Sequence, residues 1–329
     1  MSEIFFSIVV LNWNTLALLK KNLESLGAQT ERALEVIIVD NGSTDGSVEW
    51  LATDEPQKLL GELPLLVEKK EKNLGFAAGM NAGLRLAKGR WLMPLNVDVF
   101  LAPDFFTLAK ENLEKLKAPA ALGPLVYRYS KEGPTEEVLC TYMELTRLLS
   151  LTTPLELPHL GKKVFGPAGC APLFSRKALE LAAIPSELSA SGLLEYYDER
   201  YFAYGEDSDL YLRFLNLNLF SFYVPSLRCW HVHSGSQAGI RWHEKDTKTL
   251  ARLPANAIDT CLKNLRGFNF FSTLFLLFLA PLAMSLILIW RAPKKFWAPL
   301  GAYFLAASRF ERSLDLREYY LNLTNKIEE

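Results

Sequence analysis

Three carboxylates lie within four residues of one another, at Glu206, Asp207 and Asp209. They fall in the first turn of a predicted helix, where the helix dipole alone favours acidic side chains. An aromatic run precedes them, and its rings suit the walls of a site for a sugar or a lipid: Tyr197, Tyr201, Phe202 and Tyr204. A carboxylate that points into a partly desolvated crevice is a suitable general base. The segment therefore predicts acid–base chemistry, with simple dipole complementarity as the alternative.

A lone carboxylate, Asp98, ends the segment Asn96-Val97-Asp98 after the apolar residues 91–95. One carboxylate and the phosphate oxygens of a substrate commonly hold Mg2+ or Mn2+, because these hard ions keep several waters and need few protein ligands. A solvated loop aspartate is the simpler explanation of an isolated Asn-x-Asp. The position of Asp98 directly after an apolar strand favours a metal site.

Two histidines follow at a spacing that suits the binding of one metal ion by both. His231 and His233 alternate along a segment expected to be extended, so both side chains lie on one face and could reach one metal ion. Such a pair is more often structural. A metal hydrolase would also need further ligands, which His159 and His243 do not obviously supply.

A polar turn at Asp40 has the residue types that a nucleotide site needs. Gly and Asn in Asp40-Asn41-Gly42-Ser43 tolerate left-handed backbone, and Ser can cap the following helix. A carboxylate at this position could accept hydrogen bonds from a base or a ribose. An ordinary strand-to-helix turn, with Asp40 acting only as a cap, explains the pattern equally well.

Residues 73–83 combine glycines, which let the backbone approach a ligand, with Asn73 and Asn81, which can both donate and accept hydrogen bonds. A helix that starts here would present free N–H groups to a phosphate. Gly79 and Gly83 are expected to serve mainly close packing of that helix on a sheet. No GxxxxGKS/T or GxGxxG motif occurs, so neither a P-loop nor a dinucleotide-binding turn is supported.

These motifs require elements that bring distant segments together. Short β-branched runs alternate with helical patterns over residues 1–125, which is typical of an α/β fold with a parallel sheet. The strands are expected at 6–12, 34–40, 64–68, 90–95 and 120–126, and the helices at 16–27, 46–53, 76–88 and 104–116. Parallel sheets bind ligands beyond the carboxyl ends of their strands. The four polar segments that begin at Asn12, Asp40, Asn73 and Asn96 should therefore line one crevice.

The composition excludes some classes of protein. The 36 basic and 37 acidic residues give a formal net charge of -1, so no overall field draws the chain to nucleic acid. The four cysteines form no close-set pair, which suits a reducing compartment. No positive and apolar signal segment precedes the first strand, so we expect the catalytic part in the cytoplasm. The length of 329 residues allows one large or two modest domains.

The 23 residues 268–290 carry no charge, which is enough for a membrane helix of roughly 20 residues. Basic residues flank both ends, so the positive-inside rule gives no orientation. Pro281 could break the helix into a shallow re-entrant hairpin, and a buried core helix or an oligomer contact is the soluble alternative. We expect the membrane, and with it a lipid-linked acceptor. A chain that ends near Ala255 should then be more soluble and still bind its nucleotide.

In this order, the motifs resemble the family 2 inverting glycosyltransferases of GT-A fold, nearest the rhamnosyltransferase-like branch. The resemblance covers roughly residues 5–240, and the ordered set is specific although no single segment is. The matching segments are Phe6-Ser-Ile-Val-Val-Leu-Asn-Trp-Asn14, Val39-Asp-Asn-Gly-Ser-Thr-Asp-Gly-Ser47, 73–83, Leu95-Asn-Val-Asp98, Gly205-Glu-Asp-Ser-Asp209 and Trp230-His231. The implied fold is a mixed, mainly parallel sheet flanked by helices, with the apolar tail as a membrane-associated helical addition.

The resemblance implies a role for each candidate residue. Asp207 would deprotonate the acceptor hydroxyl with support from Glu206, and Asp98 would hold Mg2+ or Mn2+ with His231 as second ligand and His233 in reserve. The donor would be bound by Asn12 and Trp13 in the base pocket, Asp40 on the base, Asn73, Gly75 and Asn81 near the nucleotide and its diphosphate, and Asn96. Many relatives have an aspartate where this chain has Asn96, which leaves one carboxylate fewer for the ion.

The implied reaction moves a sugar, such as rhamnose, from a nucleotide-diphosphate sugar to a polyprenyl-diphosphate-linked glycan with inversion, in cell-surface polysaccharide synthesis. Residues 1–125 would form the nucleotide-sugar-binding half, 126–254 the acceptor-binding half, and 255–329 a helical region on the cytoplasmic face of the membrane. Two other hypotheses stay open. A nucleotidyltransferase would share the fold and the metal but lacks an evident Lys/Arg-rich triphosphate loop here. A membrane-anchored binding module would bind a nucleotide sugar without turnover.

Overall fold

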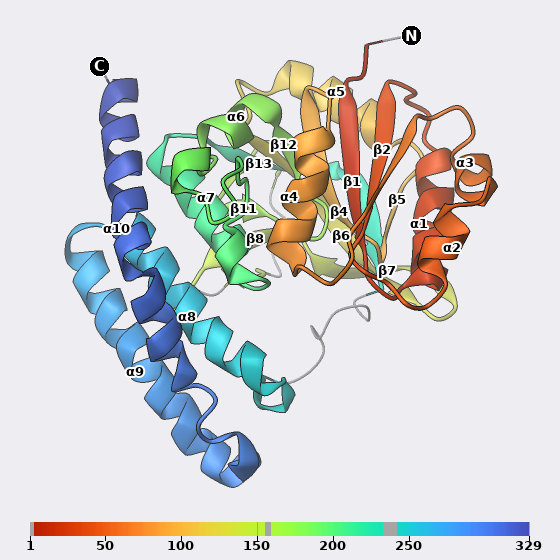
Figure 1. Ribbon diagram of the computed structural model, residues 1–329. Helices are drawn as coiled ribbons and strands as arrows, with labels where there is room; N and C mark the ends of the chain where they lie inside the picture. Colours follow the sequence, from red (N-terminus) through yellow and green to blue (C-terminus); the bar gives the residue numbers. More distant parts are fainter. Residues whose placement is uncertain (1–2, 150, 155–158, 233–241, 329) are drawn as a thin grey trace.

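A ten-stranded mixed sheet, flanked by helices, organises the chain, and three long C-terminal helices pack against its side (Figure 1). The computed structural model describes residues 3–149, 151–154, 159–232 and 242–328. The strand order is β10-β13-β6-β12-β4-β1-β2-β3, with β5 and β7 paired to β13 and β6. A separate three-stranded sheet has the order β11-β8-β9. This architecture agrees with the mixed sheet and helical tail that the sequence predicts.

The first half consists of strand–helix units whose predicted positions are confirmed. The strands β1, β2 and β4 pair in parallel, and β3 extends the sheet beyond β2. The two short elements α3 and β5 were not predicted, because they are too brief for a clear periodicity. The elements are β1 (Phe6–Asn12), α1 (Leu16–Gly27), β2 (Leu34–Asp40), α2 (Ser47–Leu51), α3 (Glu55–Leu60), β3 (Leu65–Lys69), α4 (Phe76–Leu86), β4 (Trp91–Asn96), β5 (Val99–Leu101) and α5 (Phe105–Lys115).

The second half completes the same sheet. Strand β12 lies between β4 and β6 and is antiparallel to both, whereas β13 runs parallel to β6. The elements are β6 (Ala121–Ser130), β7 (Gly133–Cys140), β8 (Tyr142–Leu145), β9 (Leu151–Thr152), β10 (Lys163–Val164), β11 (Gly166–Pro167), β12 (Leu173–Ser175), α6 (Arg176–Leu181), η1 (Ser186–Leu188), η2 (Glu199–Tyr201), α7 (Glu206–Asn216), β13 (Ser221–His231) and η4 (Trp242–Glu244).

The two faces of the sheet bury alternate residues of each strand, as the two-residue period of a strand requires. Ile8 and Val10 of β1 join the core beneath α1 and α5, and Val9 faces the core beneath α4, α6 and α7. An added Cβ at Gly79 would lie 2.6 Å from Leu11 Cδ1, and one at Gly83 would lie 2.3 Å from Val9 Cγ1. The prediction that these glycines serve close packing of α4 is therefore confirmed.

The C-terminal part consists of α8 (Thr247–Asn264), α9 (Gly267–Arg291), η5 (Pro293–Lys295) and α10 (Gly301–Glu328). Figure 1 shows α8 and α10 beside the sheet domain, with α9 on their outer side. Helix α9 continues without a break through Pro281, so the suggestion of a re-entrant hairpin is wrong. It is the one helix in the described ranges that is long and apolar enough to cross a membrane.

Buried charges dock these helices on the sheet domain. Lys263 of α8 lies 2.7 Å from an Asp198 oxygen and 2.9 Å from an Asp209 oxygen, and all three side chains are fully buried. From α10, Arg312 contacts both Asp198 and Glu195 at 3.1 Å. Burial opposes ionisation of Asp198, but Lys263 and its other cationic neighbours hold the pKa of its carboxyl well below the usual range. The C-terminal helices therefore neutralise carboxylates that the sheet domain buries.

Candidate active site

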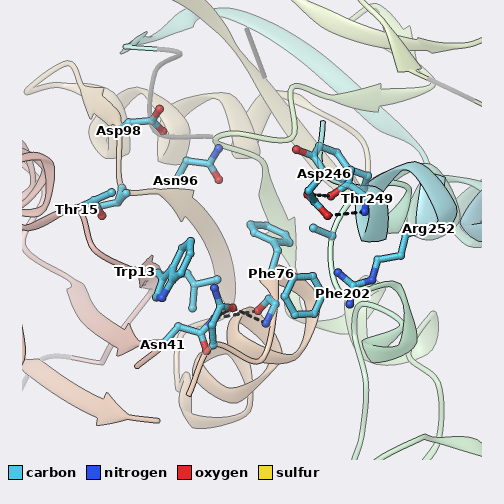
Figure 2. A pocket seen from close by; sticks show the side chains of 16 residues that line it. Trp13, Thr15, Asn41, Phe76, Asn96, Asp98, Phe202, Asp246, Thr249 and Arg252 are labelled. Atoms are coloured by element: carbon cyan, nitrogen blue, oxygen red, sulfur yellow. Dashed lines mark hydrogen bonds between the residues drawn. The ribbon is translucent and has the colours of Figure 1, made fainter. Parts of the chain in front are cut away.

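The polar segments after β1, β2 and β4 meet because these strands end in register. Asn12 is paired with Asp40, and Leu11 with Asn96. A pocket of about 480 Å³ opens beyond the strand ends, and each of the four predicted segments contributes to it (Figure 2). The prediction of one shared crevice is therefore confirmed. The lining residues from these segments are Trp13, Asn41, Asn73, Gly75, Phe76, Asn96, Val97 and Asp98.

Three predicted donor-binding residues lie outside the pocket lining. Asn12 donates to Asp40 Oδ2 at 2.8 Å, and both side chains are fully buried. Asp40 Oδ1 also accepts from the Ser43 backbone N–H at 2.9 Å, so this carboxylate shapes the turn behind the pocket. Asn81 exchanges hydrogen bonds of 2.7 and 3.0 Å with the backbone of Tyr197. Its amide thus ties α4 to the segment before α7 instead of facing a ligand.

The start of α4 is closed by protein, contrary to the expectation of free N–H groups for a phosphate. The backbone N–H groups of Phe76 and Ala77 donate to Phe202 O at 2.5 and 3.2 Å. Gly75 has a φ of +87°, and an added Cβ would lie 2.5 Å from the same oxygen. The glycine therefore permits the close approach of Phe202, and a phosphate in this pocket needs other partners.

Asp98 and His231 are brought together from the ends of β4 and β13. His231 Nε2 lies 3.2 Å from Asp98 Oδ1, because β5 and β13 pair with His231 opposite Val99. An oxygen and an imidazole nitrogen so close together suit Mn2+ or Mg2+ that takes its other ligands from substrate and water. Among the residues that the structure describes, no group of three or more such side chains could share one ion. His233 lies outside the described residues.

Glu206 and Asp207 open α7 in a desolvated environment. Burial raises the pKa of Asp207 to about 6, and burial with the nearby Asp207 charge raises the pKa of Glu206 to about 8. Glu206 Oε2 and Asp207 Oδ1 are buried and have no hydrogen-bond partner in the described part of the chain. The Asp207 carboxylate abuts Gly169, next to Cys170, whose carbonyl accepts from Asn96 N at 3.0 Å. Asp207 is therefore separated by one chain segment from Asn96, which lines the pocket.

Asp209 has three hydrogen-bond or ion-pair partners, whereas Glu206 and Asp207 each bury one oxygen without a partner in the described residues. Its oxygens accept from Arg213 at 3.1 Å, Lys263 at 2.9 Å and Asn264 at 2.8 Å. Asp209 is fully buried, and these three donors occupy most of its acceptor sites, so it holds α7 and α8 together instead of facing a substrate. Within the acidic segment, the geometry thus separates two carboxyl groups that each bury one oxygen without a partner in the described residues from one structural carboxylate.

The sequence alone gave no sign that α8 reaches the pocket. Asp246, Thr249 and Arg252 line the pocket opposite the strand ends, and Figure 2 shows Arg252 over Phe202. Asp246 caps α8 by accepting from Thr249 N at 2.9 Å. The cap at Asp246 is a local pattern that the sequence could have revealed. The sequence could not have revealed that α8 packs near residues about 150 positions earlier in the chain.

Comparison with known proteins gives a family match. The model described as glycosyl transferase family 2 matches residues 7–181, more than half of the chain. The uncharacterized glycosyltransferase YfnE of Bacillus subtilis is 30% identical over 135 residues, which are 40% of this chain and 33% of that protein. The chain thus spans only about a third of that relative's length.

Two further similarities are more extensive. The N-acetylglucosaminyl-diphospho-decaprenol L-rhamnosyltransferase of Mycobacterium tuberculosis is 28% identical over 245 residues, 67% of this chain and 73% of that protein. The mannosyltransferase PcManGT from Pyrobaculum calidifontis, solved with GDP-Man and Mn2+, is similar over 100% of this chain and 85% of its own, with a TM-score of 0.54 and 15% identity. At that identity the similarity shows the shared GT-A fold alone.

Proposed function

Because the chain belongs to glycosyl transferase family 2, we propose that it transfers a sugar from a nucleotide-diphosphate sugar to a lipid-linked glycan with inversion of configuration. The observation that carries the proposal is the meeting of all four polar segments at one pocket, with the buried carboxyl group of Asp207 against the neighbouring Gly169. The Mycobacterium relative is named for a diphospho-decaprenol acceptor and for rhamnose, which supports a polyprenyl-diphosphate acceptor and makes rhamnose the first sugar to test.

The proposed chemistry assigns one proton transfer to Asp207. The acceptor oxygen forms a bond to the anomeric carbon from the face opposite the nucleotide, while the bond from that carbon to the diphosphate breaks. The leaving electron pair goes to the diphosphate, and the acceptor proton goes to Asp207. Glu206, whose pKa is raised to about 8 by burial and by the Asp207 charge, keeps its proton at neutral pH beside this base.

Asp98 and His231 are proposed to hold a divalent ion. Their donor atoms lie 3.2 Å apart, and Asp98 lines the pocket. When bound, the ion would neutralise the diphosphate leaving group. With Asn96 in place of a second carboxylate, we expect the ion to bind tightly only together with the donor.

Asp98→Ala is expected to abolish turnover and to weaken donor binding mainly when Mn2+ is present. Nucleotide sugars are first screened by thermal stabilisation, since a ligand that binds only the folded state raises its stability. The best one is then titrated calorimetrically with Mn2+ and with EDTA, for wild type and variant. Asp54→Ala, at an exposed position away from the pocket, is the control. Full wild-type activity after thorough chelation would contradict the metal assignment.

We propose that the protein lies on a membrane, because α9 exposes a face of large apolar side chains. Its buried residues lie on one stripe that includes Thr273, Leu277 and Ser285, whereas Phe268 is 84% and Trp290 is 88% exposed. Its 25 residues span about 37 Å at the α-helical rise, against roughly 30 Å for a hydrocarbon core. Exposed apolar area of this extent indicates an apolar partner. We assign that partner to the cytoplasmic leaflet, where a polyprenyl acceptor would lie.

The full chain is expected to sediment with membranes and to need detergent for extraction. Phe271→Glu combined with Phe275→Glu should release it, because each charge costs roughly 2.5–3.5 kcal/mol in the bilayer interior. Sedimentation with phosphatidylglycerol vesicles measures the effect. Phe220→Glu, on the sheet domain, is the matched control. A wild-type protein that stays in the supernatant without detergent would overturn the membrane assignment.

A further inference from the structure

Arg252 stands out among the side chains of the pocket. It is the one positively charged side chain among the described residues that line the pocket. Its guanidinium carbon lies 4.1 Å from the ring centroid of Phe202, and Figure 2 shows it reaching from α8 to this ring. No hydrogen bond or ion pair joins it to any residue in the described ranges. Its N–H donors are therefore available to a ligand.

A cationic side chain would favour the binding of a phosphate in this pocket. Two of its lining residues, Asp98 and Asp246, are carboxylates, which repel an anionic ligand unless they are neutralised. The first N–H groups of α4 are occupied by Phe202 O, so that helix end offers them to no ligand. In the described lining, Arg252 is thus the one side chain whose own positive charge can pair with a phosphate, in addition to the divalent ion proposed at Asp98.

The support of Arg252 is rigid, which suits a binding residue. Phe202 has a left-handed backbone, with a φ of +63°, and is pinned to α4 by its carbonyl. The Asn256 amide donates to the carbonyls of Tyr201, Ala203 and Tyr204 at 3.2, 3.2 and 2.7 Å. Arg309 of α10 in turn donates to Asn256 Oδ1 at 2.8 Å. The backbone that carries this ring is therefore held by α4, and the residues on either side of it are held by α8 with support from α10.

We infer that Arg252 binds a phosphate group of a substrate in this pocket, namely the diphosphate of the donor or that of a polyprenyl acceptor. A guanidinium that stacks on an aromatic face keeps its edge N–H groups free, and their planar fork matches two phosphate oxygens. The inference rests on the proposed function for the identity of the substrates. It adds a specific residue from α8, outside the segment 7–181 that the family model matches.

The donor arm of the test compares nucleoside diphosphates with nucleosides. UDP, GDP and dTDP are titrated into wild type, and the tightest is repeated with Arg252→Gln, Arg252→Lys and the exposed control Arg90→Gln. Loss of a charge-assisted contact should weaken the diphosphate by about 10-fold or more and leave the matching nucleoside unchanged. Arg252→Lys should recover part of the loss, because it restores the charge without the fork.

The acceptor arm uses farnesyl diphosphate against farnesol in the same variants. A loss confined to farnesyl diphosphate assigns Arg252 to the acceptor, and a loss confined to the nucleotide assigns it to the donor. Unchanged affinity of Arg252→Gln for both diphosphates, with unchanged thermal unfolding, would overturn the inference and leave the proposed function standing. Wild-type binding of a nucleoside diphosphate without turnover of any nucleotide sugar would instead count against the proposed function alone.

Discussion

Asp207→Asn is expected to lower turnover by roughly 100-fold or more while donor affinity stays unchanged, which is the usual contribution of a general base. The amide has nearly the same shape as the carboxylate but cannot take the acceptor proton. Since Asp207 Oδ1 has no partner among the described residues, the substitution breaks no protein hydrogen bond at that oxygen. Single-turnover rates and donor titrations on the same preparation separate chemistry from binding.

The pH dependence gives this prediction a second measurement. Burial raises the pKa of Asp207 to about 6, so the basic form accumulates as the pH rises through about 6, and wild-type kcat/KM should rise with it. The raised pKa also means that, at pH values between the ordinary pKa of an aspartate and about 6, the folded state binds more protons than the unfolded state. Its contribution to stability is full at acidic pH and is lost as the pH rises through about 6. Asp207→Asn should lose both dependences.

The matched control is Asp209→Asn, two residues away. Asp209 accepts hydrogen bonds from Arg213, Lys263 and Asn264, so its neutralisation should lower stability instead of the chemical step. Thermal unfolding should therefore fall for Asp209→Asn and hold or rise for Asp207→Asn. A stable but inactive Asp209→Asn enzyme beside a nearly normal Asp207→Asn enzyme would reverse the assignment.

Lys263→Met is expected to lower the free energy of unfolding by about 3–5 kcal/mol, the cost of leaving buried charges without a partner. Lys263 lies 2.7 Å from Asp198, 2.9 Å from Asp209 and 4.0 Å from Asp259, and its side chain is fully buried. Methionine fills a similar volume but offers no charge. Denaturant unfolding in detergent measures the loss, and an unchanged midpoint would show that the network does not support the fold.

Lys58→Met is the control for this prediction. Lys58 pairs with Glu55 at 2.8 Å, but both side chains are more than half exposed, and exposed pairs contribute little. Its loss should leave unfolding almost unchanged. A similar destabilisation in both variants would point to a general effect of lysine removal and not to the buried network.

The same network changes the expectation for a shortened chain. Ala255 lies inside α8, so a chain that ends there loses Lys263, Arg309 and Arg312. Asp198, Asp209 and Glu195 would then be left with fewer or no cationic partners, and the carbonyls held by Asn256 would lose their donor. We expect this short chain to fold poorly, in contrast to the more soluble, nucleotide-binding chain that the sequence alone predicts. Its expression and thermal unfolding test this directly.

The sequence by itself determined where the strands end and which polar segments follow them. Short apolar runs define β1, β2 and β4, and parallel strands place their carboxyl ends on one edge. For that reason Trp13, Asn41, Asn96 and Asp98 could be predicted to share a pocket. The long uncharged segment that became α9 was equally plain, because length and absence of charge are properties of the sequence alone.

Only the tertiary structure decided which side chains face the pocket and what lies opposite them. Asn12 and Asp40 have suitable chemistry but turn toward each other, and Asn81 bonds a backbone that is distant in sequence. Arg252 reaches the pocket because α8 docks through buried ion pairs such as that between Lys263 and Asp198. Local periodicity specifies which face of an element is apolar, but the partner of a buried charge is set by long-range packing. For this reason the pocket residues that follow β1, β2 and β4 could be predicted from the sequence, whereas those that α8 supplies could not.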